Sequence, residues 1–211
     1  MFKSDVATRS ELLLTQYRKR IASSHESQIT MKLRLAKLSE AKECYQCIED
    51  ARAYHKSLGF EQWHKDYPTQ QTILDDIAKD IGFVFEDEQG VAGYCCIIIG
   101  DEPAYHKIDG AWKTDRPYAV VHRMAFSKNV RGGGLSKKAF ALIKEFCKEN
   151  NITAIRLDTQ DENKVMQHIL DREGFQYCGL IHFDGGPKLA YEWDRWFSKN
   201  GLQTKLEDEA N

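Results

Sequence analysis

The chain has 211 residues, which suffices for one well-buried domain with an appendage. Its formal net charge of −2 offers no basic surface of the kind that binds nucleic acid or an anionic membrane. No apolar run reaches the length of a transmembrane helix and the first residues lack the pattern of a secretory signal, so we expect a cytoplasmic protein.

The N-terminal segment differs in pattern from the rest of the chain. Four apolar residues recur at helical spacing between positions 13 and 21, and a polar stretch follows them. Such a helix docks either on the body of the protein or on a second copy, as in a homodimer. We predict a helical arm over residues 1–29, one domain over residues 30–197 and a polar tail over residues 198–211.

In the first half of the domain, alternating apolar residues indicate strands and apolar residues at helical spacing indicate helices. These patterns place a strand, two helices and a hairpin of two strands over residues 30–37, 38–59, 68–80, 82–87 and 90–99. Ser39 is the expected cap of the first helix, and Gly59 is its expected stop.

Cys44 and Cys47 form a CxxC pair one helical turn apart. A structural zinc site would need a second ligand pair at similar spacing, and the sequence contains none. We therefore expect no metal site and interpret the 6 cysteines as buried thiols in a reducing compartment.

The second half follows a long loop over residues 100–117 and alternates strands with helices. The expected elements are a strand, a helix, a strand, a helix and two terminal strands over residues 118–126, 135–151, 153–159, 161–174, 175–182 and 188–196. Thr159 and Glu162 should form the capping box of the later helix. Hairpins pair antiparallel, whereas strands joined through a helix lie parallel. The sequence therefore predicts an α/β fold with a mixed sheet and one strand–helix–strand crossover at its centre.

Three glycines, Gly132 to Gly134, precede the helix that begins near Leu135. A helix N-terminus presents unpaired backbone N–H groups and the positive end of the helix dipole, and glycines let phosphate oxygens approach them. Residues 132–136 are thus a candidate pyrophosphate cradle, to which Arg131 adds a fixed charge. The alternative is a tight turn, because the stretch matches neither GxGxxG nor the P-loop.

The stretch RGGGLS resembles the acyl-coenzyme A loop of the GNAT acetyltransferase superfamily, whose pattern is [QR]-x-x-G-x-[GA]. Arg131 takes its first position and Gly134 its glycine, while Ser136 replaces the usual Gly or Ala. A segment that begins at Asn163 and ends in GF is similar to a second element of the family. The resemblance covers roughly residues 30–193 and is that of an uncharacterised bacterial branch.

This resemblance implies a largely antiparallel central sheet with flanking helices and two splayed parallel strands. Acetyl-coenzyme A would be the co-substrate and would lie in the gap between those strands. A backbone N–H near Met124 would stabilise the negative charge that develops on the thioester oxygen. The residues implied for coenzyme binding are Met124, Ala125, Phe126, Arg131, Gly132, Gly133, Gly134, Leu135, Ser136 and Asn163.

The implied activity is transfer of an acetyl group to a primary amine of a small molecule or protein, by direct attack in a ternary complex. Such an amine is mostly protonated at neutral pH, so a base or a water chain must deprotonate it. His122 and Asp158 are candidate bases, although each has a structural alternative. The tyrosine that usually serves as acid is replaced by Leu170, which leaves Tyr177 or solvent. These departures keep a non-catalytic coenzyme A-binding sensor or scaffold as the alternative function.

Three loops, over residues 60–68, 104–112 and 183–187, should build the acceptor pocket. Its candidate walls are Trp63, Tyr67, Tyr105, Trp112 and Tyr191. Its candidate charges are Asp66, Lys107, Asp109 and Asp184. Because both signs of charge occur, an amino acid, a polyamine, an aminoglycoside and a protein N-terminus all remain possible acceptors.

Overall fold

The computed structural model describes residues 30–130, 132, 134–183 and 186–195. The expected N-terminal arm and C-terminal tail lie outside these residues, so the domain boundaries stay a prediction, as do the cytoplasmic location and the homodimer. Within the described ranges, no helix is both long enough and apolar enough to cross a membrane.

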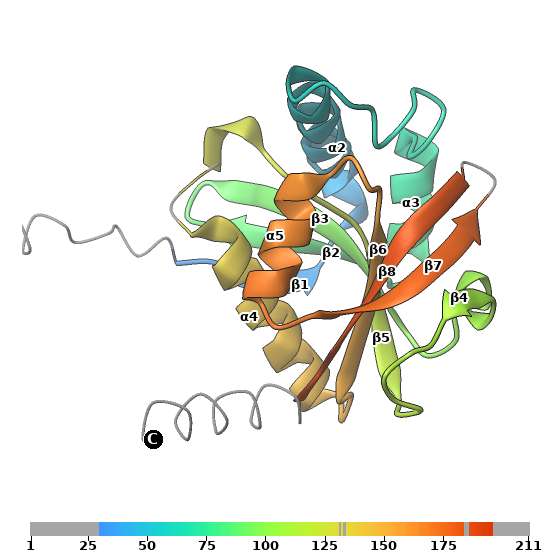
Figure 1. The fold of residues 1–211 in the computed structure, drawn as a ribbon. Helices are drawn as coiled ribbons and strands as arrows, with labels where there is room; N and C mark the ends of the chain where they lie inside the picture. Colours follow the sequence, from blue (N-terminus) through green and yellow to red (C-terminus); the bar gives the residue numbers. More distant parts are fainter. Residues whose placement is uncertain (1–29, 131, 133, 184–185, 196–211) are drawn as a thin grey trace, which may run out of the picture. The chain divides into compact units, whose positions relative to one another are not determined.

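The described elements alternate between strands and helices along the chain (Figure 1). The strands are β1 (Lys32–Leu35), β2 (Gly82–Asp87), β3 (Gly90–Ile99), β4 (Ile108–Gly110), β5 (Tyr118–Phe126), β6 (Ala154–Thr159), β7 (Gln176–Phe183) and β8 (Gly186–Asp194). The α-helices are α2 (Ala41–Ser57), α3 (Gln70–Ala78), α4 (Leu135–Glu149) and α5 (Lys164–Arg172). Short 3-10 turns cover Leu38–Glu40, Pro103–His106 and Lys128–Val130.

All eight strands form one sheet in the order β1-β2-β3-β5-β6-β8-β7-β4. Every neighbouring pair is antiparallel except β5 and β6, which α4 connects and which lie parallel. The predicted mixed, largely antiparallel sheet with one central crossover is therefore confirmed. The segment predicted as a long loop also contains β4, which pairs with β7 from Ile108↔Ile181 to Gly110↔Gly179.

The parallel strands β5 and β6 separate soon after they meet. They pair only from Tyr118↔Ala154 to Val120↔Arg156. Beyond Val120, β5 continues beside β3 alone, and β6 continues beside β8 alone as far as Thr159. The expected splay is thus present, and it opens the sheet at its centre.

A β-bulge bends β5 where the splay begins. Tyr94 lies opposite Ala125 and Cys96 lies opposite His122, so β5 carries one extra residue in between. Arg123 in this bulge has φ of +53°, in the left-handed region that non-glycine residues rarely adopt. Its guanidinium donates two hydrogen bonds of 2.9 Å to Asp76 of α3, a buried ion pair that holds the bulge in place.

The helices cover both faces of the sheet (Figure 1). Successive side chains of a strand point to opposite faces. In β2, Phe83 packs on Phe146 of α4 with ring centroids 4.9 Å apart, whereas Val84 belongs to the cluster that α2 and α3 cover. Helices α2 and α3 therefore lie on one face, and α4 lies on the other. Helix α5 lies beside α4 in Figure 1, and Phe175, which follows α5, packs against Phe140 of α4.

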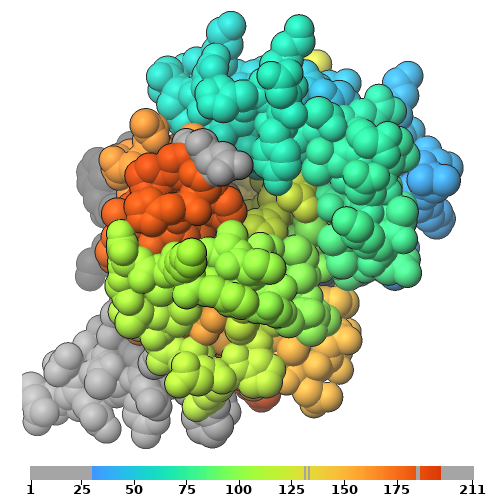
Figure 2. All heavy atoms as spheres, turned by 90° about the vertical axis from the view of Figure 1, so that its right-hand side faces the viewer, coloured from blue at the N-terminus to red at the C-terminus, as the bar shows by residue number. Residues whose placement is uncertain are grey.

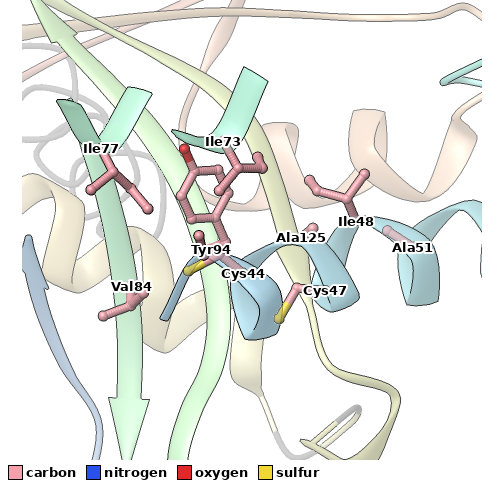
Figure 3. Close-up of a cluster of buried hydrophobic side chains, with 10 residues drawn as sticks. Cys44, Cys47, Ile48, Ala51, Ile73, Ile77, Val84, Tyr94 and Ala125 are labelled. Atoms are coloured by element: carbon pink, nitrogen blue, oxygen red, sulfur yellow. The ribbon is translucent and has the colours of Figure 1, made fainter. Parts of the chain in front are cut away.

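Figure 3 shows the core cluster that contains Cys44 and Cys47 of α2 together with Ile48, Ile73 and Tyr94. These two cysteines are 0% and 2% exposed, and burial raises the pKa of each thiol to about 12. All six cysteines are free and buried, as predicted. Among the described residues, no group of three or more His, Cys, Asp or Glu side chains could hold a metal ion.

Two predicted helix caps are wrong, because neighbouring residues take their place. Residues Leu38–Glu40 form a 3-10 turn, so α2 begins at Ala41 and Ser39 does not cap it. Helix α5 begins at Lys164, and the side chain of Asn163, rather than Thr159 and Glu162, accepts the N–H of Met166 at 3.0 Å. The predicted stop of α2 is confirmed, since Gly59 follows its end with φ of +87°.

Candidate functional site

A cavity of about 650 Å³ opens in the splay between β5 and β6. Its lining comes from the bulged part of β5, the end of β6, the loop after α2, the start of α5 and the β7–β8 hairpin. In Figure 2 this face is hollowed between the loop after α2 (cyan), the segment around residue 105 (lime) and the β7–β8 hairpin (orange). A local break in strand pairing thus creates room for a ligand inside the sheet.

His122 of β5 lies on the wall of this cavity between two carboxylates. Its Nε2 is 3.2 Å from Oε2 of Glu102, and its Nδ1 is 3.7 Å from Oδ1 of Asp158. Glu102 is held in place as the cap of the Pro103–His106 turn, where its Oε1 accepts the N–H of Ala104. The hydrogen bond with His122 lowers the pKa of Glu102, so this carboxylate is ionised near neutral pH.

Asp158 reaches the same point from β6, across the splay. Its Oδ1 accepts a hydrogen bond of 2.7 Å from the hydroxyl of Tyr105, which is 1% exposed. Burial, followed by the charge of Asp158, raises the pKa of Tyr105 well above its usual value. Tyr105 therefore stays protonated as a hydrogen-bond donor and fixes the orientation of the Asp158 carboxylate. The structure thus brings two of the three predicted catalytic residues together.

At another part of its wall the cavity reaches the N-terminus of α5 through Asn163 and Met166, whereas no described residue at the N-terminus of α4 is in its lining. Gly134 is the N-cap of α4 with φ of +72°, and Gly132 has φ of +100°. A Cβ atom at either glycine would meet nothing within 4 Å, so backbone conformation rather than crowding favours glycine here. The N–H of Leu135 donates to the carbonyl of Gly132 at 3.1 Å, and the N-cap makes no side-chain hydrogen bond to the helix. The amides that follow Leu135 in the first turn of α4 are therefore the candidates for an anionic ligand.

The remaining predicted coenzyme residues lie in different surroundings. Met124 and Asn163 line the cavity. Leu135 and Ala125 are buried, and the ring of Phe126 lies 5.1 Å from that of Phe85. Ser136 accepts a hydrogen bond of 2.9 Å from Arg172. Arg131 and Gly133 lie outside the described residues.

A family profile described as Acetyltransferase (GNAT) family matches residues 39–175, more than half of the chain. The chain belongs to the GNAT acetyltransferase family. A family member from Streptococcus agalactiae shares 36% sequence identity over 78% of this chain and 95% of that chain, with a TM-score of 0.70. No protein with a curated description matches the chain.

Two more distant structures show the same fold. A GNAT-family acetyltransferase from Listeria monocytogenes has 22% identity and a TM-score of 0.62, covering 78% of this chain and 94% of that one. The aminoglycoside acetyltransferase AAC(6')-Ib, in complex with coenzyme A and kanamycin, has 17% identity and a TM-score of 0.60, covering 81% and 98%. The predicted resemblance to this family is confirmed.

Asn163, which the family resemblance assigns to the coenzyme, already makes two side-chain hydrogen bonds within the protein. It is 4% exposed; its Oδ1 caps α5, and its Nδ2 donates to Oε1 of Gln62. Asn163 therefore ties the start of α5 to the loop after α2. This contact joins the two segments that flank the mouth of the splay.

Tyr177, the predicted acid of this GNAT site, lies apart from His122 and Asp158. It is 50% exposed on β7, and its ring packs edge-on against Tyr191, 5.8 Å away. Neither tyrosine belongs to the lining of the cavity. A register shift in β7 between Tyr177 and Gly179 accompanies this placement.

Two of the five residues predicted as walls of the acceptor pocket belong to the lining of this cavity. Trp63 and Tyr67 line the cavity, whereas Tyr105 and Trp112 pack behind Asp158, where the indole of Trp112 donates 3.0 Å to the carbonyl of Tyr105. The predicted charges Asp66, Lys107 and Asp109 are not in the described lining, and Asp184 lies outside the described residues. The charged and titratable lining residues that sequence reasoning missed are His55, His64, Glu102, Arg123 and Lys188.

Proposed function

We propose that this GNAT protein is an N-acetyltransferase that moves an acetyl group from acetyl-coenzyme A to a primary amine of a small molecule. The observation that carries the proposal is His122, held between Glu102 and Asp158 on the wall of a cavity inside the splay. A volume of about 650 Å³ suits one small acceptor beside the end of the coenzyme. A coenzyme A complex of an aminoglycoside acetyltransferase with the same fold supports the choice of co-substrate.

In this proposal the coenzyme lies along the free edge of β5 at Met124 to Phe126. The amides of residues 132–136 receive its pyrophosphate, because they start α4 and end the glycine stretch. Arg131 adds charge to the same cradle. The thioester then reaches the bulge, where a backbone N–H near Met124 stabilises the oxyanion.

His122 is the proposed base. When its Nε2–H donates to Glu102, its Nδ1 carries the lone pair and lies 3.7 Å from Oδ1 of Asp158. Nδ1 accepts a proton from the acceptor ammonium, and Asp158 stabilises the imidazolium that results. The amine nitrogen then bonds to the acetyl carbon as the carbon–sulfur bond breaks. The proton that the nitrogen loses on becoming an amide passes through solvent to the thiolate, and the protonated His122 releases its own proton to solvent.

The test combines calorimetry with an assay of thiol release. We expect acetyl-coenzyme A to bind the purified chain and free thiol to appear when an amine acceptor is added. Saturable binding without thiol release from a broad panel of amines would favour the sensor or scaffold function instead. No binding at all would contradict the placement of the coenzyme in the splay.

We expect Gly134→Asp to weaken acetyl-coenzyme A binding at least about tenfold, because it places a negative charge where the pyrophosphate would bind. Gly134→Asn is the matched control, since asparagine also tolerates a positive φ but carries no charge. Calorimetric dissociation constants would be compared between the two variants. Equal affinities would remove Gly134 from the cradle.

We expect Glu102→Gln to lower kcat/KM about tenfold, because the negative charge that holds the Nε2 proton of His122, and so leaves Nδ1 as the acceptor, is lost. Glutamine keeps a side chain of the same size at the same place. Calorimetry should show unchanged affinity for acetyl-coenzyme A. Equal kcat/KM values for the variant and the wild type would mean that Glu102 does not orient His122.

A further inference from the structure

Lys188 of β8 is a cation on the cavity wall that the proposed chemistry does not use. It is half-buried, pairs with Ile181 across the β7–β8 hairpin and lines the cavity together with Phe183. With the amide of Gln160 oriented to donate to the carbonyl of Glu61, its oxygen accepts a hydrogen bond of 2.9 Å from Nζ of Lys188. The ammonium thus has a neutral hydrogen-bond partner, Gln160, which lines the same cavity.

The other charged groups of the lining already have partners. Glu102 faces His122, and Asp158 accepts from Tyr105. Arg123 is bound by both oxygens of Asp76. Among the described residues, no carboxylate oxygen lies within 4.0 Å of Nζ of Lys188. Of the two basic side chains in the described lining, Arg123 therefore has a close carboxylate partner and Lys188 has none.

Burial disfavours the charged form of this ammonium and so lowers the pKa of Lys188. The negative charges of Asp158 and Glu162, which are more distant, raise that pKa in part. An anionic ligand group beside Nζ would supply the missing close partner and a charge-assisted hydrogen bond. The pyrophosphate of the coenzyme is assigned to the α4 cradle, so that anion has to come from the acceptor.

We propose that the acceptor is an amino acid or a similar amine that also carries a carboxylate, which Lys188 binds while the amine faces His122. This inference rests on the proposed acetyltransferase function. It also predicts poor acceptance of polycations, since the described lining offers only Glu102 and Asp158 as carboxylates, both engaged, and Lys188 repels a second ammonium. The cavity would then differ in specificity from that of AAC(6')-Ib, whose structure holds kanamycin.

The experiment compares amino acids with their decarboxylated amines, such as phenylalanine with phenethylamine and lysine with cadaverine, and includes kanamycin as a polycation. Values of kcat/KM from thiol release are corrected for the fraction of neutral amine. We expect at least one amino acid to be preferred over its decarboxylated partner by about 10- to 100-fold. Lys188→Met should reduce this preference at least about tenfold. The control is Lys79→Met, which removes an exposed lysine remote from the described lining and should preserve the preference.

Each outcome separates the two proposals. Thiol release that is faster with the decarboxylated amines or kanamycin would overturn the carboxylate assignment and leave the acetyltransferase function standing. A preference that survives Lys188→Met would remove Lys188 as its cause. Bound acetyl-coenzyme A with no thiol release from any amino acid, amine or kanamycin would overturn the proposed function itself, and the inference with it.

Discussion

A His122→Ala variant is expected to turn over about 10²- to 10⁴-fold more slowly than the wild type, because it removes the proposed base. Its affinity for acetyl-coenzyme A should be unchanged, since His122 lies at the end of the cavity near Glu102 and Asp158 rather than at the α4 cradle. Single-turnover rates and calorimetry on the same preparation would measure the two quantities. The loss should appear in kcat more than in the dissociation constant of the coenzyme.

His182→Ala is the matched control for this experiment. Like His122, His182 pairs with a carboxylate, at 2.9 Å from Asp109, but it is exposed and lies outside the described cavity lining. Its removal should leave turnover within about twofold of the wild type. Equal rates for His122→Ala and the wild type would assign His122 a structural role and shift deprotonation to a water chain.

Glu192→Ala is expected to destabilise the protein by about 3 to 5 kcal/mol, because it leaves a buried cation without its partner. Glu192 of β8 is 0% exposed and accepts a hydrogen bond of 3.1 Å from Nε of Arg156. The Arg156 guanidinium is itself enclosed by the rings of Trp112 and Tyr118, at 4.4 and 3.9 Å from their centroids. Alanine would leave the guanidinium of Arg156 buried without its carboxylate partner.

The same carboxylate also fastens the chain between β4 and β5. Its oxygens accept from the backbone N–H groups of Lys113 and Thr114 and from the hydroxyl of Thr114. Denaturant unfolding would measure the loss, with Glu145→Ala as control, because Glu145 pairs with Lys148 in an exposed position and should cost at most about 1 kcal/mol. Similar losses for the two variants would refute the idea that Glu192 and Arg156 form an essential buried pair.

The central part of the fold could be predicted from the sequence because its signals are local. The strand, helix and strand predicted over residues 118–126, 135–151 and 153–159 correspond closely to β5, α4 and β6. β4 was missed because three residues within a polar loop carry no periodic pattern. Its pairing with β7 depends on a partner some seventy positions away, which no local window contains.

The candidate site was predictable only in part, for a similar reason. His122 and Asp158 could be selected because His122 lies on the strand before the glycine stretch and Asp158 lies near the end of the next strand. Glu102 lies in an acidic loop, where no spacing of residues in the sequence singles it out as functional. It contacts His122 because it caps the Pro103–His106 turn, which holds its carboxylate in place. Tyr105 was interpreted as a wall of the pocket, whereas burial places it behind Asp158 as a hydrogen-bond donor.

The buried cysteines bear on how the protein tolerates its own product. Acetyl transfer would release coenzyme A, a thiol whose oxidised forms exchange with protein thiolates that reach solvent. All six cysteines are free but buried, and burial raises the pKa of Cys96 and Cys147 to about 12 as well. Mixed disulfides with coenzyme A therefore have no ready site on these cysteines, and oxidised coenzyme A should leave the protein unmodified.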